Sequence, residues 1–263
     1  MKIWLACFLV AISQLQGAIV EVEHFQEVPL HIKKETLVIF DIDDTLLIPV
    51  QMLGCDEWYM HRLKQSQQAG LTPTTAFEKA LNEWEAVRFL TKMEIVEPKS
   101  EKIVRSLQDQ NYTVMGLTTQ GLALATRTVH QLNENQIDLS ITCPSKEDHY
   151  FLIGGHGVLY RQGILFTSGT SKGESLFALL DKLGIKPERI VFLNDKATHL
   201  RDIEQVAQMR GVEFIGLRYA YSDARKKAFS PEIADFEWNH SPLCHLLSDE
   251  EAKKEMQATK GTD

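Results

Sequence analysis

Apolar runs and amphipathic segments alternate along most of the chain. The runs have the length and the β-branched residues of buried strands, and segments with apolar positions at helical spacing follow them. The predicted strands are 37–40, 112–117, 137–143, 190–193 and 214–217. The predicted helices are 100–109, one through His130, 174–183 and 197–209. This alternation predicts an α/β fold whose centre is a doubly wound parallel sheet.

Two stretches interrupt the alternation. Residues 54–95 are predicted to form a small helical insertion, in which Thr72 caps a helix that begins at Pro73. The apolar stripe of that helix is predicted to pack in the core, and its members are Phe77, Leu81, Trp84, Val87 and Phe89. Residues 150–166 carry short β-type runs separated by glycines, which predict a β-hairpin or meander. Residues 19–32 are predicted to form an edge strand or loop.

Acidic side chains directly follow the first buried run. Asp41 and Asp43 alternate with Ile42, so an extended backbone points both carboxylates to the same side. The C-terminal ends of strands are where open α/β sheets bind ligands. Two carboxylates there repel each other unless a cation lies between them, and a hard, oxygen-liganded ion such as Mg²⁺ fits. Taken alone, the pattern is equally typical of an aspartate-rich turn without a ligand.

Four polar positions together resemble a known family. They are Asp41-Ile42-Asp43-Asp44-Thr45 after one strand, Thr118 ending a second, Lys172 near the start of a helix, and Asn194-Asp195 ending a third strand. In this order they resemble the four motifs of the haloacid dehalogenase (HAD) superfamily of phosphatases, from about residue 37 to residue 217. The resemblance implies a Rossmann-like, HAD-like domain over residues 19–247, with residues 54–95 as a cap over the site.

The resemblance also implies a role for each motif residue. Asp41 is the expected nucleophile, which forms an aspartyl-phosphate. Asp43 is the expected general acid and then base, and Thr45 is expected to brace the loop. Lys172 is expected to neutralise both Asp41 and the phosphate. The expected phosphate-binding residues are Ile42, Thr118, Thr119 and Lys172.

The expected metal is Mg²⁺. The resemblance assigns its ligands as the Asp41 side chain, the Asp43 carbonyl oxygen and the Asp195 side chain. Asn194 departs from the acidic residue or glycine that many relatives carry before the metal-binding aspartate. His199 stands where relatives have an acid or asparagine, and it is either an outer-shell residue or an ordinary helix residue. Asp202 is a further outer-shell candidate, so the supporting set is Thr45, Asn194, His199 and Asp202.

An acid at position 43 narrows the expected reaction. Dehalogenases and phosphonate hydrolases of the superfamily lack an acid there, so Asp43 favours a Mg²⁺-dependent phosphomonoester hydrolase or a phosphomutase. A non-catalytic, secreted HAD-like binding protein is the alternative from another class. The expected partner is a phosphorylated small molecule or a phosphoprotein substrate. Trp58, Tyr59, His61 and Arg62 in the cap are candidates to face that substrate, although packing is the favoured role of Trp58.

The net charge and the two ends of the chain bear on the partners and the location of the protein. The 263 residues carry a formal net charge of −8, which argues against a nucleic-acid partner.

Residues 1–18 have the pattern of a signal peptide, too short in its apolar part for a membrane span, and they predict an exported, periplasmic or secreted protein. Residues 248–263 are charged and predict a frayed helix or disordered tail. The remaining cysteines, Cys55, Cys143 and Cys244, allow one disulfide or three buried thiols. The oligomeric state is open.

Overall fold

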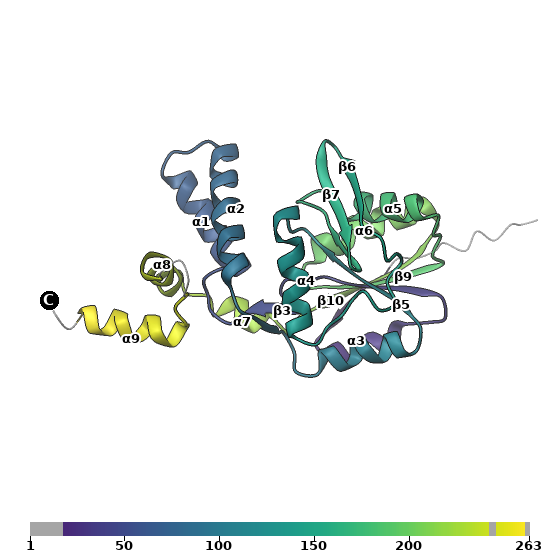
Figure 1. Ribbon diagram of the computed structural model, residues 1–263, viewed down its shortest axis with the longest axis horizontal. Helices are drawn as coiled ribbons and strands as arrows, with labels where there is room; N and C mark the ends of the chain where they lie inside the picture. The colour runs from purple at the N-terminus through teal and green to yellow at the C-terminus, as the bar shows by residue number, and fades with distance from the viewer. Residues whose placement is uncertain (1–17, 242–245, 261–263) are drawn as a thin grey trace, which may run out of the picture.

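The computed structural model describes residues 18–241 and 246–260, and within them the centre of the molecule is an eight-stranded sheet (Figure 1). The strand order is β1-β10-β9-β2-β5-β8-β7-β6. Neighbours from β1 to β8 in this order are parallel, whereas β7 and β6 continue the sheet in antiparallel fashion. The strands are β1 (Ala18–Val22), β2 (Thr36–Phe40), β5 (Thr113–Thr118), β6 (His149–Ile153), β7 (His156–Arg161), β8 (Ile164–Phe166), β9 (Arg189–Asn194) and β10 (Glu213–Tyr219). The predicted α/β class, its parallel sheet, the edge strand and the hairpin are confirmed.

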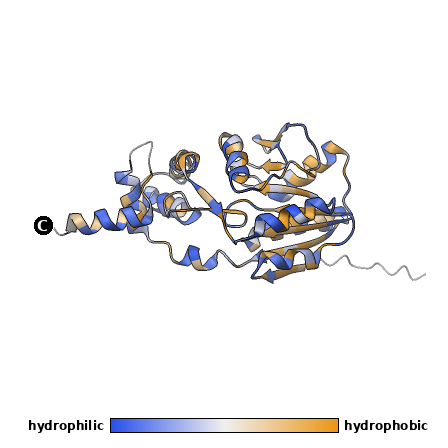
Figure 2. Ribbon diagram, turned by 60° about the horizontal axis from the view of Figure 1, so that its bottom comes forward, coloured by the Kyte–Doolittle hydropathy of each residue, from blue (hydrophilic) through white to orange (hydrophobic). Residues whose placement is uncertain are grey.

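Helices cover both faces of this sheet. Helices α3 (Ser100–Asp109) and α4 (Ala125–Glu134) pack on one face, and α5 (Lys172–Leu183) and α6 (Ala197–Arg210) pack on the other. The side chains of β2 are buried on both sides, because Val38 belongs to the first of these cores and Ile39 to the second. Figure 2 shows the apolar strands between the amphipathic helices. The central strand is therefore fixed from both faces, and so is the position of the loop that follows it.

A second, smaller lobe lies beside the sheet. It contains α1 (Asp56–Gln68) and α2 (Pro73–Leu90), which the short antiparallel strands β3 (Leu47–Pro49) and β4 (Met93–Ile95) connect to the body. Helices α7 (Asp223–Lys227), α8 (Pro231–His240) and α9 (Asp249–Lys260) follow β10, and α8 packs against α1 (Figure 1). Two 3-10 helices, η1 (Phe25–His31) and η2 (Leu122–Leu124), complete the described elements.

One local prediction is wrong, and the structure decides between the alternatives for two others. Residues 137–143 form turns in place of a strand, because the Asp138 carboxylate accepts hydrogen bonds from both the backbone N–H and the hydroxyl of Ser140. The described part of the predicted C-terminal tail is the helix α9, which packs against α8. Cys55 and Cys143 are free thiols, and Cys244 lies outside the described residues. The predicted leader also lies outside them except for Ala18, which begins β1.

A buried carboxyl group joins α8 to the base of the small lobe. Glu237 is fully buried, and its Oε2 accepts a hydrogen bond of 2.8 Å from the backbone N–H of Leu53. Burial, together with a hydrogen bond to Asp249, raises the pKa of Glu237 from 4.5 to about 8. Glu237 is therefore protonated in the folded protein at pH values where it is ionised in the unfolded chain.

This pKa predicts how stability depends on pH. Because the folded state holds the proton more tightly, the free energy of unfolding falls as pH rises from about 4.5 to about 8, by at most about 1.4 kcal/mol per pH unit from this group. Chemical denaturation across this range measures the slope. Glu237→Gln is expected to flatten it, whereas Glu232→Gln, at an exposed position of the same helix, is expected to leave it unchanged. An unchanged slope in the Glu237 variant would contradict the assignment.

Candidate active site

An aspartate and a lysine form a buried ion pair at the end of the central strand. Asp41 directly follows β2, and its backbone N–H donates to the carbonyl of Leu193 in the neighbouring β9 at 3.0 Å. Lys172 enters from the first turn of α5, with Nζ 2.7 Å from Asp41 Oδ1 and 3.2 Å from the Leu117 carbonyl oxygen. Asp41 is 4% exposed and Lys172 is 1% exposed. The two charges are therefore matched in a site that excludes most water.

Opposing effects act on the Asp41 carboxyl group. Burial raises its pKa, the ammonium group of Lys172 lowers it, and the negative charge of Asp43 raises it again. The net result is a pKa of Asp41 above its ordinary value. Asp41 thus depends on neighbouring cations to remain an ionised nucleophile.

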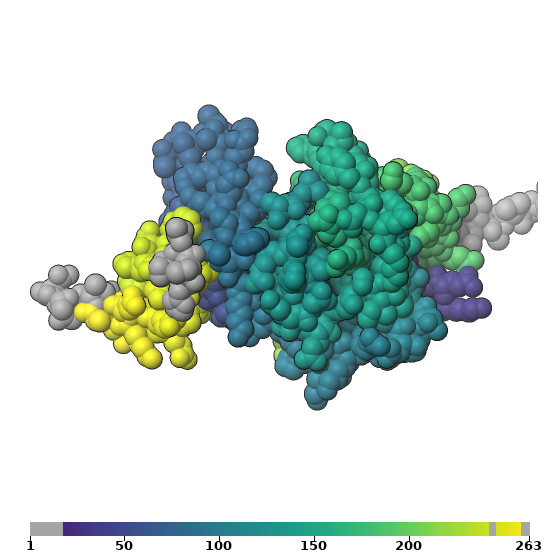
Figure 3. Space-filling model, in the orientation of Figure 1, coloured from purple at the N-terminus to yellow at the C-terminus, as the bar shows by residue number. Residues whose placement is uncertain are grey.

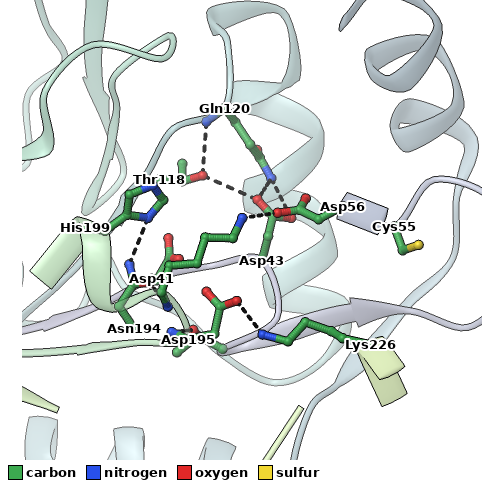
Figure 4. Close-up of polar contacts among 12 residues, drawn as sticks. Asp41, Asp43, Cys55, Asp56, Thr118, Gln120, Asn194, Asp195, His199 and Lys226 are labelled. Atoms are coloured by element: carbon green, nitrogen blue, oxygen red, sulfur yellow. Dashed lines mark hydrogen bonds and ion pairs between the residues drawn. The ribbon is translucent and has the colours of Figure 1, made fainter. Parts of the chain in front are cut away.

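Asp43 receives hydrogen bonds from both lobes of the protein. Gln120 Nε2 lies 2.9 Å from Asp43 Oδ2 and 3.1 Å from Oδ1, and the hydroxyl of Thr118 lies 3.4 Å from Oδ2 (Figure 4). The guanidinium group of Arg88, from the last turn of α2, forms an ion pair with Oδ1. These donors face both carboxylate oxygens of Asp43 and fix the orientation of its side chain.

Sequence reasoning missed two of these partners. Gln120 lies two residues after Thr118 and could have been found by extending that motif along the loop. Arg88 is buried, with 3% of its surface exposed, and stacks its guanidinium group 5.3 Å from the ring centre of Trp84. Arg88 lies in the last turn of a helix, where a basic residue is common for reasons of helix stability. Its position in the sequence therefore did not indicate a contact with Asp43.

Asp195 lies at the end of β9, next to Asp41. Its backbone N–H donates to the hydroxyl of Thr45 at 3.2 Å, so Thr45 links the two acidic loops. Its Oδ2 pairs with Lys226 Nζ of α7 at 2.8 Å (Figure 4), a contact that sequence reasoning also missed. Its Oδ1 is buried and has no hydrogen-bond partner among the described residues. An unpartnered carboxylate oxygen facing this site is a place where a cation is stabilising.

The expected Mg²⁺ ligands fit such a cation. Burial raises the pKa of Asp195, the nearby Lys196 lowers it, and the charge of Asp41 raises it, so the two carboxylates repel each other across the site. Carboxylate and carbonyl oxygens are the donors that Mg²⁺ prefers. Within the described ranges, no three His, Cys, Asp or Glu side chains group as a metal centre. The expected set differs from such a cluster because it uses two side chains and the main-chain carbonyl of Asp43.

The supporting residues hold loops and helix ends. The side chain of Asn194 accepts a 2.7 Å hydrogen bond from the backbone N–H of Lys196. Asn194 Nδ2 also lies 3.4 Å from His199 Nδ1. Burial, followed by the charges of Lys172 and Lys196, lowers the pKa of His199 to about 3, so its imidazole is neutral near pH 7. Asp202 accepts hydrogen bonds from Ser171 Oγ at 2.8 Å and the Gly173 N–H at 3.2 Å, which fixes the start of α5 and hence Lys172.

The remaining predicted phosphate-binding positions lie beside these groups. Thr118 is buried, and its Oγ accepts a 3.1 Å hydrogen bond from the backbone N–H of Gln120. Thr119 is exposed and faces a cavity next to the site. Ile42 buries its side chain in the core, and its carbonyl oxygen accepts hydrogen bonds from the N–H groups of Leu46 and Leu47, which closes the acidic loop.

The cavity has a volume of about 730 Å³ and lies between the small lobe and the body, where the space-filling view is hollowed (Figure 3). Tyr59 and His61 line it, as predicted for the cap. Trp58 is fully buried against Trp238, which confirms the favoured packing role. Arg62 forms an ion pair with Glu83 and does not line the cavity.

The apolar stripe of α2 divides between the core and the surface. Trp84 and Val87 are buried in the core of the small lobe. Phe77 is 47% exposed and Phe89 is 55% exposed, so the prediction that both pack in the core is wrong. Leu81 packs beside the lobe core, and Phe77, Leu81 and Trp84 all line the cavity.

Comparison with known proteins finds relatives along nearly the whole chain. A family described as "Protein of unknown function (DUF2608)" matches residues 21–253. A Chlamydia pneumoniae protein, provisionally named an outer membrane protein, is 27% identical over 94% of this chain and 92% of its own length. A Chlamydia trachomatis protein with the same provisional name is 22% identical over 82% of this chain and 80% of its own length.

Solved structures with a related arrangement include two hydrolases. A haloacid dehalogenase-like hydrolase from Streptococcus pneumoniae aligns with a TM-score of 0.43 and 12% identity, covering 69% of this chain and 93% of its own. A HAD-superfamily hydrolase from Ehrlichia chaffeensis aligns with a TM-score of 0.41 and 14% identity, covering 74% of this chain and 97% of its own. Both TM-scores are below 0.5, so neither activity is transferred to this chain.

Proposed function

The chain belongs to the DUF2608 family of proteins of unknown function, and we propose that it is a Mg²⁺-dependent phosphomonoester hydrolase that works through an aspartyl-phosphate intermediate. The buried contact between Asp41 and Lys172 carries this proposal. A purely structural ion pair needs no further acids around it, yet Asp43 and Asp195 lie at the same edge of the sheet. Phosphoryl transfer requires a nucleophile, a proton carrier and concentrated positive charge at one point.

The first step transfers the phosphoryl group to the protein. A carboxylate oxygen of Asp41 attacks the phosphorus atom while the bond from phosphorus to the ester oxygen breaks. Asp43, protonated at this stage, gives its proton to the departing oxygen, so an alcohol leaves. We assign the ammonium group of Lys172, 2.7 Å from Asp41, and the hydroxyl of Thr118 to stabilising the negative charge on the phosphoryl oxygens.

The second step releases phosphate. The Asp43 carboxylate takes a proton from water, the water oxygen attacks phosphorus, and the bond to Asp41 breaks. Gln120 and Arg88 contact the Asp43 carboxylate and hold it in place for this step. Cleavage of that bond restores the Asp41 carboxylate, Asp43 keeps the proton taken from water for the next cycle, and inorganic phosphate leaves.

The Asp41 and Asp195 side chains and the Asp43 carbonyl oxygen would hold the proposed metal. When bound, Mg²⁺ neutralises charge on the phosphoryl group and the nucleophile. The unpartnered Oδ1 of Asp195 supports this assignment. The pairing of Lys226 with the other oxygen of Asp195 leaves Oδ1 in a defined orientation.

Phosphate release from an aryl phosphate tests the proposal. The purified protein is expected to hydrolyse 4-nitrophenyl phosphate with Mg²⁺, to lose activity in EDTA, and to regain it when Mg²⁺ is added in excess. Glucose 1-phosphate, with product analysis, separates hydrolysis from the phosphomutase alternative, which yields an isomeric sugar phosphate. Absence of phosphate release across a broad panel of phosphomonoesters with Mg²⁺ would favour the non-catalytic binding protein.

We also propose that the protein is exported. The signal-peptide pattern of residues 1–18 supports this, and so do the provisional names of the chlamydial relatives. Among residues 18–241 and 246–260, no helix is long and apolar enough to cross a membrane. Sequencing the N-terminus of the mature protein tests the proposal, because cleavage near residue 18 is expected and an intact Met1 would contradict it.

A further inference from the structure

The cavity beside the proposed catalytic groups has a mainly apolar wall. Tyr59, Phe77 and Trp84 form part of it, with Tyr59 packed edge-on against both other rings at centroid distances of 6.4 Å. Phe77 remains 47% exposed, and Met60, on the same cavity, remains 58% exposed. Large apolar side chains that stay exposed around a concave surface gain stability when an apolar ligand covers them.

The floor of the cavity reaches the catalytic groups. Gln120 lines the cavity and also donates to both oxygens of Asp43. Thr119, also on the floor, directly follows Thr118, and His199 adds a neutral imidazole. The departing oxygen of a substrate must lie near Asp43 to receive its proton, so the group attached to that oxygen extends into this cavity.

The charged lining residues leave little for a second anionic group. Lys196 forms an ion pair with Asp56, and His61 Nε2 lies 3.0 Å from Asp235 Oδ2. The lining also contains two acids, Asp56 and Glu57, whose negative charges balance the positive charges of Lys64 and Lys196. A polyphosphate would meet no surplus of positive charge, and a sugar would place its hydroxyls against the rings of Tyr59, Phe77 and Trp84 on the apolar wall.

We propose, on the basis of the proposed function, that the substrate is a phosphomonoester with a large apolar leaving group that packs against Tyr59, Phe77 and Trp84. The phosphoryl group lies over Asp41, and the apolar body fills the cavity between the small lobe and the sheet. The small lobe therefore selects the leaving group, whereas the body carries out the chemistry.

Three phosphates of primary alcohols test this specificity, because their departing oxygens differ little in type. The value of kcat/KM is expected to rise from glucose 6-phosphate through benzyl phosphate to 2-naphthylmethyl phosphate, by about tenfold or more overall, since each added ring removes apolar surface from water. Equal values for all three, or a preference for the sugar phosphate, would overturn the inference.

A matched pair of variants locates the selecting surface. Phe77→Ser is expected to lower kcat/KM for 2-naphthylmethyl phosphate about tenfold and to leave that for methyl phosphate unchanged. Phe89→Ser, at a similarly exposed position of the same helix that does not line the cavity, is expected to change neither value. Equal effects of the two substitutions would contradict the role of Phe77.

Binding separates this inference from the proposed reaction. Calorimetry with 2-naphthylmethylphosphonate and methylphosphonate, which cannot be hydrolysed as esters, is expected to give the tighter dissociation constant for the naphthyl compound. If that preference is found while no phosphate ester is hydrolysed, the result supports the apolar binding site and contradicts the proposed reaction. If esters are hydrolysed and neither binding nor turnover favours the apolar compounds, the reaction holds and this inference fails.

Discussion

Asp41→Asn is expected to lower kcat/KM for a chromogenic aryl phosphate by at least about 1,000-fold, the largest effect among the substitutions considered. The amide has nearly the same shape as the carboxylate but cannot attack phosphorus, so the covalent step is lost. Stopped assays of phosphate release measure the effect. Rapid acid quenching with a ³²P-labelled substrate is expected to trap phosphate on the wild-type protein and none on the variant.

Asp44→Asn is the matched control for this experiment. Asp44 lies in the same acidic loop and is buried, and its Oδ2 has no hydrogen-bond partner among the described residues. Its backbone φ of 58° lies in the left-handed region, which asparagine tolerates well. Activity within about threefold of wild type is expected, because the new amide replaces no contact made by Oδ2. Equal losses in the two variants would show that the loop, and not the Asp41 nucleophile, was affected.

Lys172→Met is expected to lower the free energy of unfolding by about 3 kcal/mol when measured in EDTA. The methionine side chain fills a similar space but leaves the buried Asp41 carboxylate without its ammonium partner at 2.7 Å. Denaturant unfolding at neutral pH measures the loss. Activity is expected to fall with stability, because the same charge is assigned to the phosphoryl group.

A double-variant cycle shows whether that loss comes from the ion pair. Adding Asp41→Asn to Lys172→Met is expected to recover about 2 kcal/mol, because the double variant no longer buries an uncompensated charge. Lys182→Met, at an exposed position of the same helix, is expected to change stability by less than about 0.5 kcal/mol. Additive losses in the double variant would contradict a coupled pair.

Local hydrophobic patterns predicted the fold well where the burial of a segment does not depend on which particular neighbours it has. The run 37–40 is apolar at every position because both faces of β2 are covered, and that property depends on no particular neighbour. The segment 137–143 also contains apolar residues, and a strand is predicted there for the same reason. There, Asp138 bonds to the backbone of Ser140, and β8 takes the place beside β5. A short apolar run cannot reveal whether a sheet has a free position for it.

Parallel connectivity explains why the principal site residues could be placed from sequence. Once β2, β5 and β9 are parallel neighbours, their C-terminal ends must lie at one edge, which brings Asp41, Thr118 and Asp195 together. The helix that starts at Lys172 covers a face of that sheet and delivers its ammonium group to the same point. These positions follow from chain order and the geometry of parallel sheets.

The sequence by itself determined the alternation of strands and helices, the acidic loop after β2 and the order of the four polar motifs. Only the tertiary structure decided that Arg88 and Gln120 contact Asp43, that Lys226 contacts Asp195, and that Phe77 faces a cavity. The physical reason is that these contacts join segments whose separation in sequence carries no periodic signal. An amphipathic pattern identifies the apolar face of a helix, but the packing of the two lobes decides whether that face meets protein or remains open beside a site.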